Sequence, residues 1–306
     1  MYQQYYGLRE MPFSLTPDTQ FFFDSEGHRE VFNTLVLALR HSEGFIKIVG
    51  EVGTGKTLLC RKLLASLDAQ FITAYIPNPF LTPEELKGFL ATEIGLRVNP
   101  ETPSYQLLNT IYRRLLALAR NKRQVVLVVD EAQAMPRETI EALRLLTNLE
   151  TEKRKLLQVV LLGQPELDQL LERPDLRQLK QRIVFSETLR SIDRKTLPAY
   201  IGYRLQSAGY SGPPLFSGSA LGLLHRASGG VPRLINILAH KALLVAYGQG
   251  RRRIGMSQVA RAVCDTGESR WIGRLMARQG YWLWPLLAGS SVLAAWAGYQ
   301  WLGVSA

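Results

Sequence analysis

The chain has 306 residues, of which 46% are hydrophobic and 21% are charged. This length allows one large or two modest domains with a sizeable core, and the composition excludes a largely disordered chain. The 37 Lys and Arg residues exceed the 26 Asp and Glu residues, so the formal net charge is +11. A basic balance of this kind is typical of proteins that contact nucleic acid or anionic lipid.

The cysteines and histidines do not form a recognisable metal or disulfide pattern. Cys60 and Cys264 are far apart in the sequence, which disfavours a disulfide framework or a zinc site and fits a reducing compartment. The four histidines show no metal-ligand spacing, and we expect them at the surface or partly packed: His28, His41, His225 and His240. The first residues, MYQQYYGLREMPF, have no basic stretch before an apolar run, so we expect no secretory signal.

Residues 1–44 are expected to flank an α/β nucleotide-binding core that covers residues 45–189. The core alternates short apolar runs with helical stretches, a pattern that predicts a parallel sheet between helices. The predicted strands are 45–50, 71–76, 124–130, 156–163 and 183–189. The predicted helices are 56–67, 82–94, 103–121 and 137–150, the second capped by Thr82 and the last with Ile140, Leu143, Leu146 and Leu149 on one face.

Residues 190–268 have no strand pattern and predict a small, all-helical lid domain. One helix is expected within 193–209, ending at Gly209, and a second is expected to begin after Ser217 and to stop at Gly229 and Gly230. A third is expected from Pro232 to Gly248, followed by a short helix from about residue 257 to 265.

The stretch GEVGTGKT at residues 50–57 fits a phosphate-binding P-loop. It follows a predicted strand and opens a predicted helix, as this motif requires. Glycines let backbone N–H groups surround phosphate oxygens, and the helix N-terminus adds its dipole. We therefore predict an ATP-binding segment made of Gly50, Glu51, Val52, Gly53, Thr54, Gly55, Lys56, Thr57 and Leu58, with Lys56 on the β- and γ-phosphates.

The stretch VVLVVDE places two carboxylates at the end of a buried strand. The carboxyl ends of parallel strands face the ligand crevice, so Asp130 is expected to hold Mg²⁺ through water, with the Thr57 hydroxyl as the second protein contact to the metal. Glu131 is expected to be the general base that activates the attacking water. A helix N-cap is the structural alternative for Asp130.

Three more polar side chains are candidates for catalysis. Gln164 follows the fourth predicted strand, where it can position the water or the γ-phosphate. Arg182 precedes the fifth strand and Arg233 begins a lid helix, and an arginine that meets the γ-phosphate can raise the rate about a thousandfold or more. We also expect Arg233 to contact the nucleotide. Arg177 is the rival to Arg182, and a surface ion pair is the alternative for each.

The P-loop, DEAQ, Gln164, QRI and SGGVPRLIN together resemble the AAA+ ATPases of the general secretion pathway protein A (ExeA) family, as does the opening YYGLREMPFSLTPDTQFFF. Within it, the chain is most similar to the ATPases of MSHA-type pilus biogenesis. The resemblance covers about residues 1–268. It implies a cytoplasmic module that forms a ring of identical subunits, for example a hexamer, and serves assembly of a pilus or secretion machine.

Residues 279–306 contain no charged residue and predict a transmembrane helix at 281–304. Trp282 and Trp301 are separated by about 28 Å of helix, close to the thickness of a hydrocarbon core, and the aromatic residues gather at both ends of the run. Arg270, Arg274 and Arg278 lie in the preceding segment, 269–280. The positive-inside rule then places the ATPase module in the cytoplasm and the protein at a bacterial inner membrane. A buried C-terminal core helix is the alternative.

Seven arginines lie between Arg251 and Arg278, against Asp265 and Glu268, and they suit anionic lipid headgroups. No aromatic-interleaved basic strand or reading helix is evident, which disfavours nucleic acid. The preferred function is a membrane-tethered ATPase that binds ATP and Mg²⁺ and works with assembly proteins of a pilus or secretion machine. The alternatives are a DNA-transaction ATPase resembling transposition ATP-binding proteins, a helicase, and a nucleotide switch that does not hydrolyse.

Overall fold

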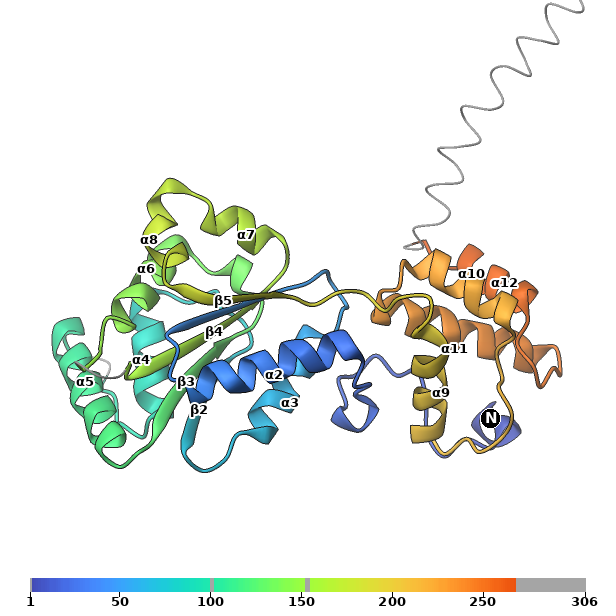
Figure 1. Ribbon diagram of the computed structural model, residues 1–306, viewed down its shortest axis with the longest axis horizontal. Coiled ribbons are helices and arrows are strands. Elements are labelled where there is room, and N and C mark those ends of the chain that lie inside the picture. The colour runs from blue at the N-terminus through green and yellow to red at the C-terminus, as the bar shows by residue number, and fades with distance from the viewer. Residues whose placement is uncertain (1, 100–101, 152–154, 268–306) are drawn as a thin grey trace, which may run out of the picture.

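The computed structural model describes residues 2–99, 102–151 and 155–267 (Figure 1). Its first part is a five-stranded parallel sheet with the strand order β2-β3-β4-β1-β5. The strands are β1 (Phe45–Val49), β2 (Phe71–Ile76), β3 (Gln124–Val129), β4 (Leu157–Gly163) and β5 (Ile183–Thr188). All five predicted strands are therefore confirmed, with ends that differ by no more than one residue.

Helices cover both faces of the sheet (Figure 1). One face packs on α2 (Glu26–Arg40) and α3 (Lys56–Ser66). The other face packs on α4 (Pro83–Glu93), α5 (Ser104–Arg120), α6 (Arg137–Leu146), α7 (Glu166–Leu171) and α8 (Arg177–Lys180). Because β1, β3 and β4 are sandwiched in this way, nearly all of their side chains are buried on both faces, which explains their largely apolar sequences.

Two helix ends differ from the prediction. The helix predicted at 137–150 ends at Leu146, and Leu149 lies beyond the helix, where it still packs on the core. The helix expected within 193–209 is α9 (Leu197–Ser207); Asp193 caps the preceding turn by accepting from the Thr196 amide at 2.6 Å. Gly209 follows with a left-handed φ of 89°, so it terminates the turn after the helix rather than the helix itself.

The remaining lid helices agree closely with the prediction. They are α10 (Gly218–Ser228), α11 (Pro232–Gly248) and α12 (Met256–Cys264). Ser217 caps α10 and Gly229 ends it in the left-handed region, while Pro232 begins α11. These helices share one hydrophobic cluster with α9.

The N-terminal flank contains structure that the sequence pattern did not predict. Its first segment forms α1 (Tyr2–Tyr6) and a short 3₁₀ turn at Thr19–Phe21, and Tyr2, Tyr6 and Phe13 pack into the hydrophobic cluster of the lid helices. Helix α2 instead packs on the sheet. The flank therefore contributes to both hydrophobic clusters, and the segment between α1 and α2 connects them.

None of the helices within residues 2–99, 102–151 and 155–267 combines the length and the apolar character needed to cross a membrane. The predicted basic segment, 269–280, and the predicted transmembrane helix, 281–304, lie outside these residues.

Candidate nucleotide-binding site

The P-loop connects β1 to α3 at the carboxyl edge of the sheet. Gly53 and Gly55 have left-handed φ values of 80° and 103°, so the loop curls in a way that other residues rarely adopt. No side chain caps α3 at Gly55, which leaves the first N–H groups of that helix for a ligand. A cradle of glycines at an uncapped helix N-terminus fits the phosphates of a nucleotide.

Lys56 is buried, with 5% of its surface exposed. Its ammonium donates to the carbonyl oxygens of Gly50 and Glu51, at 2.7 and 3.2 Å, and so spans the first turn of the P-loop. Burial lowers the pKa of Lys56, while the carboxylates of Glu131 and Asp130 oppose this shift. The ammonium is therefore held inside the loop rather than in solvent, next to two negative charges.

Asp130 is buried at the end of β3 and faces the P-loop. Its Oδ2 atom accepts from the Thr57 hydroxyl at 2.7 Å and from the Tyr75 hydroxyl at 3.3 Å, and its Oδ1 atom accepts from the Glu131 amide at 2.9 Å. The two residues predicted to hold Mg²⁺ are thus in direct contact, although 73 positions separate them. A hydroxyl and a carboxylate are ligands that suit this ion, which keeps several waters and binds substrate phosphates.

Glu131 has a left-handed backbone, with φ 51° and ψ 38°. A non-glycine residue in this region is strained, and such strain is most often found at functional sites. The Glu131 carboxylate accepts from the side-chain amides of Gln133 and Gln164, at 2.6 and 2.8 Å. Burial by itself raises the pKa of Glu131, but these hydrogen bonds and the charge of Lys56 outweigh it and leave the pKa below its usual value. The group therefore stays ionised and able to accept a proton.

Gln133 also connects β3 to β4. Its side-chain oxygen accepts from the Gln164 backbone amide at 3.0 Å, so Glu131, Gln133 and Gln164 form a closed triangle of hydrogen bonds. Sequence reasoning predicted Glu131 and Gln164 but missed Gln133. Its position two residues after Glu131 was the only available signal.

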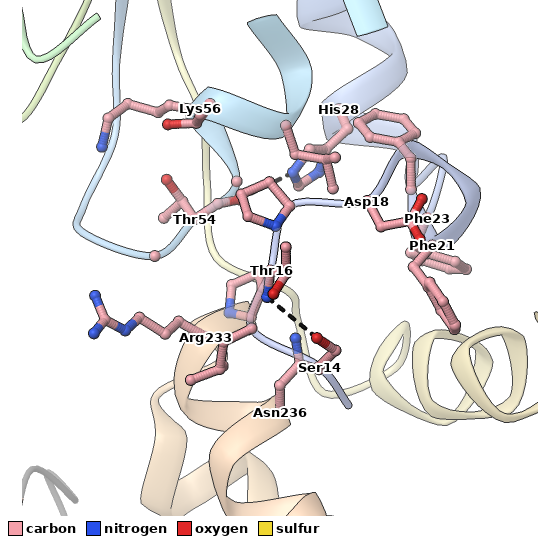
Figure 2. A pocket seen from close by; sticks show the side chains of 18 of the residues that line it. Ser14, Thr16, Asp18, Phe21, Phe23, His28, Thr54, Lys56, Arg233 and Asn236 are labelled. Carbon is pink, nitrogen blue, oxygen red and sulfur yellow. Dashed lines mark hydrogen bonds between the residues drawn. The ribbon is translucent and has the colours of Figure 1, made fainter. Parts of the chain in front are cut away.

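The lid contributes Arg233 directly to the P-loop. The Arg233 amide donates to the Gly53 carbonyl at 3.1 Å, and a Cβ atom at Gly53 would lie 2.5 Å from the Cβ of Arg233. In Figure 2 the Lys56 and Arg233 side chains both extend toward the left of the view, Lys56 within the curve of the P-loop and Arg233 below it. The structure therefore places Arg233 against the P-loop, and its contact with a nucleotide stays a prediction.

Arg182 lies elsewhere. It precedes β5, and Ile183 pairs with Phe45 at the amino end of β1, whereas the P-loop follows the carboxyl end of that strand. The separation is about 15 Å at the rise of a strand. The Arg182 guanidinium donates to the Asn148 side chain and, at 3.5 Å, to the Arg144 carbonyl. Arg182 is thus not part of the P-loop site of its own chain.

The P-loop opens into a cavity of about 460 Å³ between the sheet, the lid and the N-terminal segment (Figure 2). Besides P-loop residues, Glu131 and Arg233, its lining includes residues that the sequence prediction did not include: Ser14, Leu15, Thr16, Pro17, Asp18, Phe21, Phe22, Phe23, His28, Ile192, Tyr200, Arg204 and Asn236. The aromatic cluster in PDTQFFF is the signal that could have identified Phe21, Phe22 and Phe23, whereas the lining residues from the lid carry no such local signal. A cavity of this size with aromatic walls can hold the base and sugar of a nucleotide.

A buried arginine holds the N-terminal segment against the lid. Arg204 of α9 is 5% exposed, donates to the carbonyls of Pro12 and Ser14 at 2.6 and 2.9 Å, and lies 4.6 Å from the Phe21 ring centre. On the sheet side, Arg61 of α3 donates to the Pro17 carbonyl at 2.8 Å. The segment is therefore fastened to both parts of the molecule that enclose the cavity.

His28 corrects the expectation that the histidines lie at the surface or are only partly packed. Its side chain is buried between α2 and the P-loop, with 8% exposed. One ring nitrogen is 2.7 Å from the Ser25 hydroxyl and the other is 3.1 Å from the Thr54 carbonyl. Because a carbonyl only accepts, Nε2 carries the proton and Nδ1 accepts from Ser25.

Comparison with known proteins supports this geometry. Residues 39–171 match the family described as AAA domain. The chain is 42% identical to general secretion pathway protein A of Aeromonas hydrophila over 309 residues, which are 99% of this chain and 55% of that protein. The chain thus spans about half the length of this curated relative.

Solved structures share the fold at low identity. The ORC1 protein of Aeropyrum pernix, solved in complex with DNA, matches with a TM-score of 0.60 and 19% identity, covering 84% of this chain and 69% of that one. A Walker-type ATPase of Pyrococcus abyssi matches with a TM-score of 0.59 and 18% identity, covering 89% and 80%. The RuvB branch migration motor of Thermotoga maritima matches with a TM-score of 0.52 and 17% identity, covering 79% and 69%. These likenesses show the shared fold, whereas the 42% identity along nearly the whole chain shows that the protein belongs to the general secretion pathway protein A family, and its AAA domain with a P-loop identifies an ATP hydrolase.

Proposed function

We propose that this protein is a membrane-tethered AAA ATPase that hydrolyses ATP to support assembly of a type II secretion machine or an MSHA-like type IV pilus. The observation that carries the hydrolytic part is the joined network of Thr57, Asp130, Glu131, Gln133 and Gln164 beside the P-loop. The secretion part rests on the 42% identity to general secretion pathway protein A along nearly the whole chain.

In this proposal the P-loop binds the phosphates and Lys56 supplies their cationic contact. The Lys56 ammonium now bonds two loop carbonyls, and it needs only to change partners within the loop to meet a phosphate oxygen. Arg233, which the lid holds against Gly53, adds a second cation beside the nucleotide. Binding is thereby linked to the position of the lid.

Thr57 and Asp130 would hold Mg²⁺, which would supply positive charge against the negative charge that develops on the phosphates. Their 2.7 Å contact supports the assignment because both oxygens converge on one point at the P-loop. Tyr75, which also donates to Asp130, keeps that carboxylate oriented.

Glu131 is proposed to take the proton from the attacking water. Its carboxylate is ionised and is held by two amide donors, so its direction is set before substrate binds. Gln164 would hold Glu131 through its side-chain amide, and its remaining hydrogen-bonding groups would position the attacking water. The Gln133 contact to the Gln164 backbone keeps the two strand ends in register.

The proposal includes a ring of identical subunits. Arg182 is remote from its own P-loop, so it can serve a nucleotide only on a neighbouring subunit. Arg177 remains its rival: it is exposed, and its side chain has no hydrogen bond or ion pair within the described ranges, whereas Arg182 is bonded to Asn148. An arginine that is free in one subunit is the better placed to reach another.

Membrane tethering is proposed through residues 281–304, with the ATPase module in the cytoplasm, beside anionic lipid and the assembly proteins of the inner membrane. Cells that express the full chain can be fractionated with a carbonate wash. Retention in the membrane supports the proposal, and release contradicts it. A chain cut after Arg278 should become soluble and keep its ATP site, because the residues of that site lie within 14–236.

The function is tested by purifying the full-length membrane protein and identifying what co-purifies. A Glu131→Gln chain, which should retain ATP, is expected to enrich secretion or pilus assembly proteins, and Lys56→Ala, which should not bind ATP tightly, is the control. Enrichment of neither class, with ATP turnover stimulated by duplex DNA instead, would favour a DNA-transaction ATPase.

A further inference from the structure

A second cavity lies in the lid and is separate from the nucleotide site. It has a volume of about 710 Å³. Its walls come from three segments: α1 with the residue that follows it, the loop between α9 and α10, and the turn between α11 and α12. They contribute Gln4, Tyr5, Tyr6, Gly7, Tyr210, Ser211, Gly212, Pro213, Pro214, Leu215, Arg252 and Arg253.

Hydrogen bonds fix the three walls to one another, so the cavity is preformed. The Tyr5 and Tyr6 hydroxyls donate to the carbonyls of Gly250 and Arg251, at 2.7 and 2.8 Å. The Ile254 amide donates to the Leu215 carbonyl at 2.8 Å. The turn that carries the arginines is thereby held at its backbone, while its side chains are left for other contacts.

Two guanidinium groups stand at the rim without a counter-charge. Arg252 and Arg253 are exposed, and neither forms a hydrogen bond or an ion pair with any residue in 2–99, 102–151 or 155–267. The Arg252 guanidinium lies 5.6 Å from the centre of the Tyr5 ring, so the aromatic ring supports its position. Both arginines line the cavity, so an anion bound there would supply the counter-charge that they lack among the described residues.

We propose that this cavity binds a phosphate ester. Two arginines in the lining of one cavity match the charge and the several acceptor oxygens of a phosphate, whereas a single carboxylate needs only one guanidinium. The cavity is much larger than a phosphate group, and its tyrosine, proline and leucine walls can take the organic part of the ligand. The phosphate can belong to a soluble ester or to an anionic lipid headgroup.

The site is distinct from the P-loop. Tyr5 packs on Tyr247 near the end of α11, whereas Arg233 of the nucleotide site begins the same helix. Tyr247 lies 14 positions after Arg233, which corresponds to about 20 Å along the helix. A ligand in this cavity therefore does not overlap with ATP, and α11 connects the two sites.

The test uses the full-length chain with Mg²⁺ and one equivalent of a non-hydrolysable ATP analogue, so that the P-loop is occupied and no excess of the analogue competes for the second cavity. Inorganic pyrophosphate is titrated in by calorimetry. The double variant Arg252→Ala, Arg253→Ala is expected to weaken binding by about tenfold or more, the usual effect of losing charge-assisted hydrogen bonds. Arg261→Ala removes one exposed arginine of α12, outside the cavity lining, and should leave the affinity unchanged.

A second arm identifies the source of the phosphate. The same chains are incubated with vesicles of phosphatidylcholine, with and without phosphatidylglycerol. All of these chains share the same C-terminal segment, so any vesicle binding by that segment is equal in every chain. If only the double variant loses its preference for phosphatidylglycerol, the ligand is a lipid headgroup. If pyrophosphate binding depends on the arginines and vesicle binding does not, the ligand is a soluble ester. No pyrophosphate binding, equal binding by the double variant, or binding of polyglutamate in place of pyrophosphate overturns the proposal.

Discussion

The Nε2 atom of His28 donates to the Thr54 carbonyl across 3.1 Å, so helix α2 of the N-terminal flank is hydrogen-bonded to the P-loop (Figure 2). The Ser25 hydroxyl fixes the other ring nitrogen at 2.7 Å. The bond from Nε2 gives the Thr54 carbonyl a hydrogen-bond donor and fixes its direction within the P-loop. His28 is thus a positioning residue for the loop.

The first prediction concerns His28. Replacement by Phe leaves the buried Thr54 carbonyl without its donor, which should lower the free energy of unfolding by about 1–3 kcal/mol and weaken ATP binding several-fold. His28→Gln, whose amide can still donate, should recover most of both. Chemical denaturation and ATP titration measure the two effects, and equal losses in Phe and Gln variants would show that the hydrogen bond is not the cause.

The same residue predicts a pH dependence. Burial lowers the pKa of His28 from 6.5; the hydrogen bond to Thr54 and the charge of Asp24 oppose this shift, and the charge of Lys62 assists it. The unfolded chain therefore binds a proton at His28 more readily than the folded chain does. The contribution of neutral His28 to the free energy of unfolding is complete above about pH 6.5, and it is lost as the pH falls toward the pKa of the folded state. Denaturation at several pH values should show a smaller acid loss in His28→Gln than in the wild type. Burial also lowers the pKa of His240, but this residue contributes the same pH dependence of stability to both chains, so it does not affect the difference between them.

Glu131→Gln should retain ATP binding and lose turnover by about 10²–10⁴-fold, because an amide cannot accept the proton of the attacking water. Gln also keeps the size of the side chain, so the P-loop geometry should survive. Single-turnover hydrolysis and nucleotide titration separate the two properties. Turnover within about threefold of wild type is too little for loss of a general base, and Glu131 would then lose that role.

Gln133→Ala should shift the acid limb of the pH–rate profile upward. The Gln133 amide stabilises the ionised form of Glu131, so its removal raises the pKa of that carboxyl, and activity is lost at a higher pH as the solution is acidified. Gln106→Ala, on an exposed helix face, is the matched control. An unshifted limb with lower activity throughout would indicate that Gln133 acts only through folding.

Gly53→Ala should separate the lid from the P-loop. Its φ of 80° is unfavourable for alanine, and the new methyl group would lie 2.5 Å from the Arg233 Cβ. We expect at least tenfold weaker ATP binding. Gly88→Ala is the control, since Gly88 lies in α4 with open space around it and alanine favours a helix. Unchanged affinity in Gly53→Ala would mean that the contact of the lid with the loop does not contribute to binding.

The trans-acting arginine can be identified by mixing variants. An Arg182→Ala chain keeps Glu131 but lacks the arginine, and a Glu131→Gln chain has the opposite defect, so mixed oligomers should recover some ATP turnover at shared interfaces. The same mixture is made with Arg177→Ala. If a mixture recovers ATP turnover, the arginine replaced in it acts on a neighbouring subunit. If neither mixture recovers turnover, although light scattering confirms oligomers, both arginines have structural roles only.

Sequence alone determined the sheet, the P-loop and the two carboxylates after β3, because these depend on local patterns. Buried parallel strands require continuous apolar runs, and a phosphate loop requires glycines and a lysine at set spacing. The lid helices were predictable for the same reason, from Ser217, Gly229 and Pro232 at their ends.

Only the tertiary structure decided which distant residues meet. The burial of His28 and the division of the first 44 residues between two hydrophobic clusters follow from packing across long sequence separations. The Gln133 triangle depends on β3 and β4 being neighbours, and the exclusion of Arg182 from its own site depends on the parallel pairing of β5 with β1. No local propensity encodes these contacts, since each arises from the order of the strands and from the way the N-terminal segment closes over the sheet and the lid.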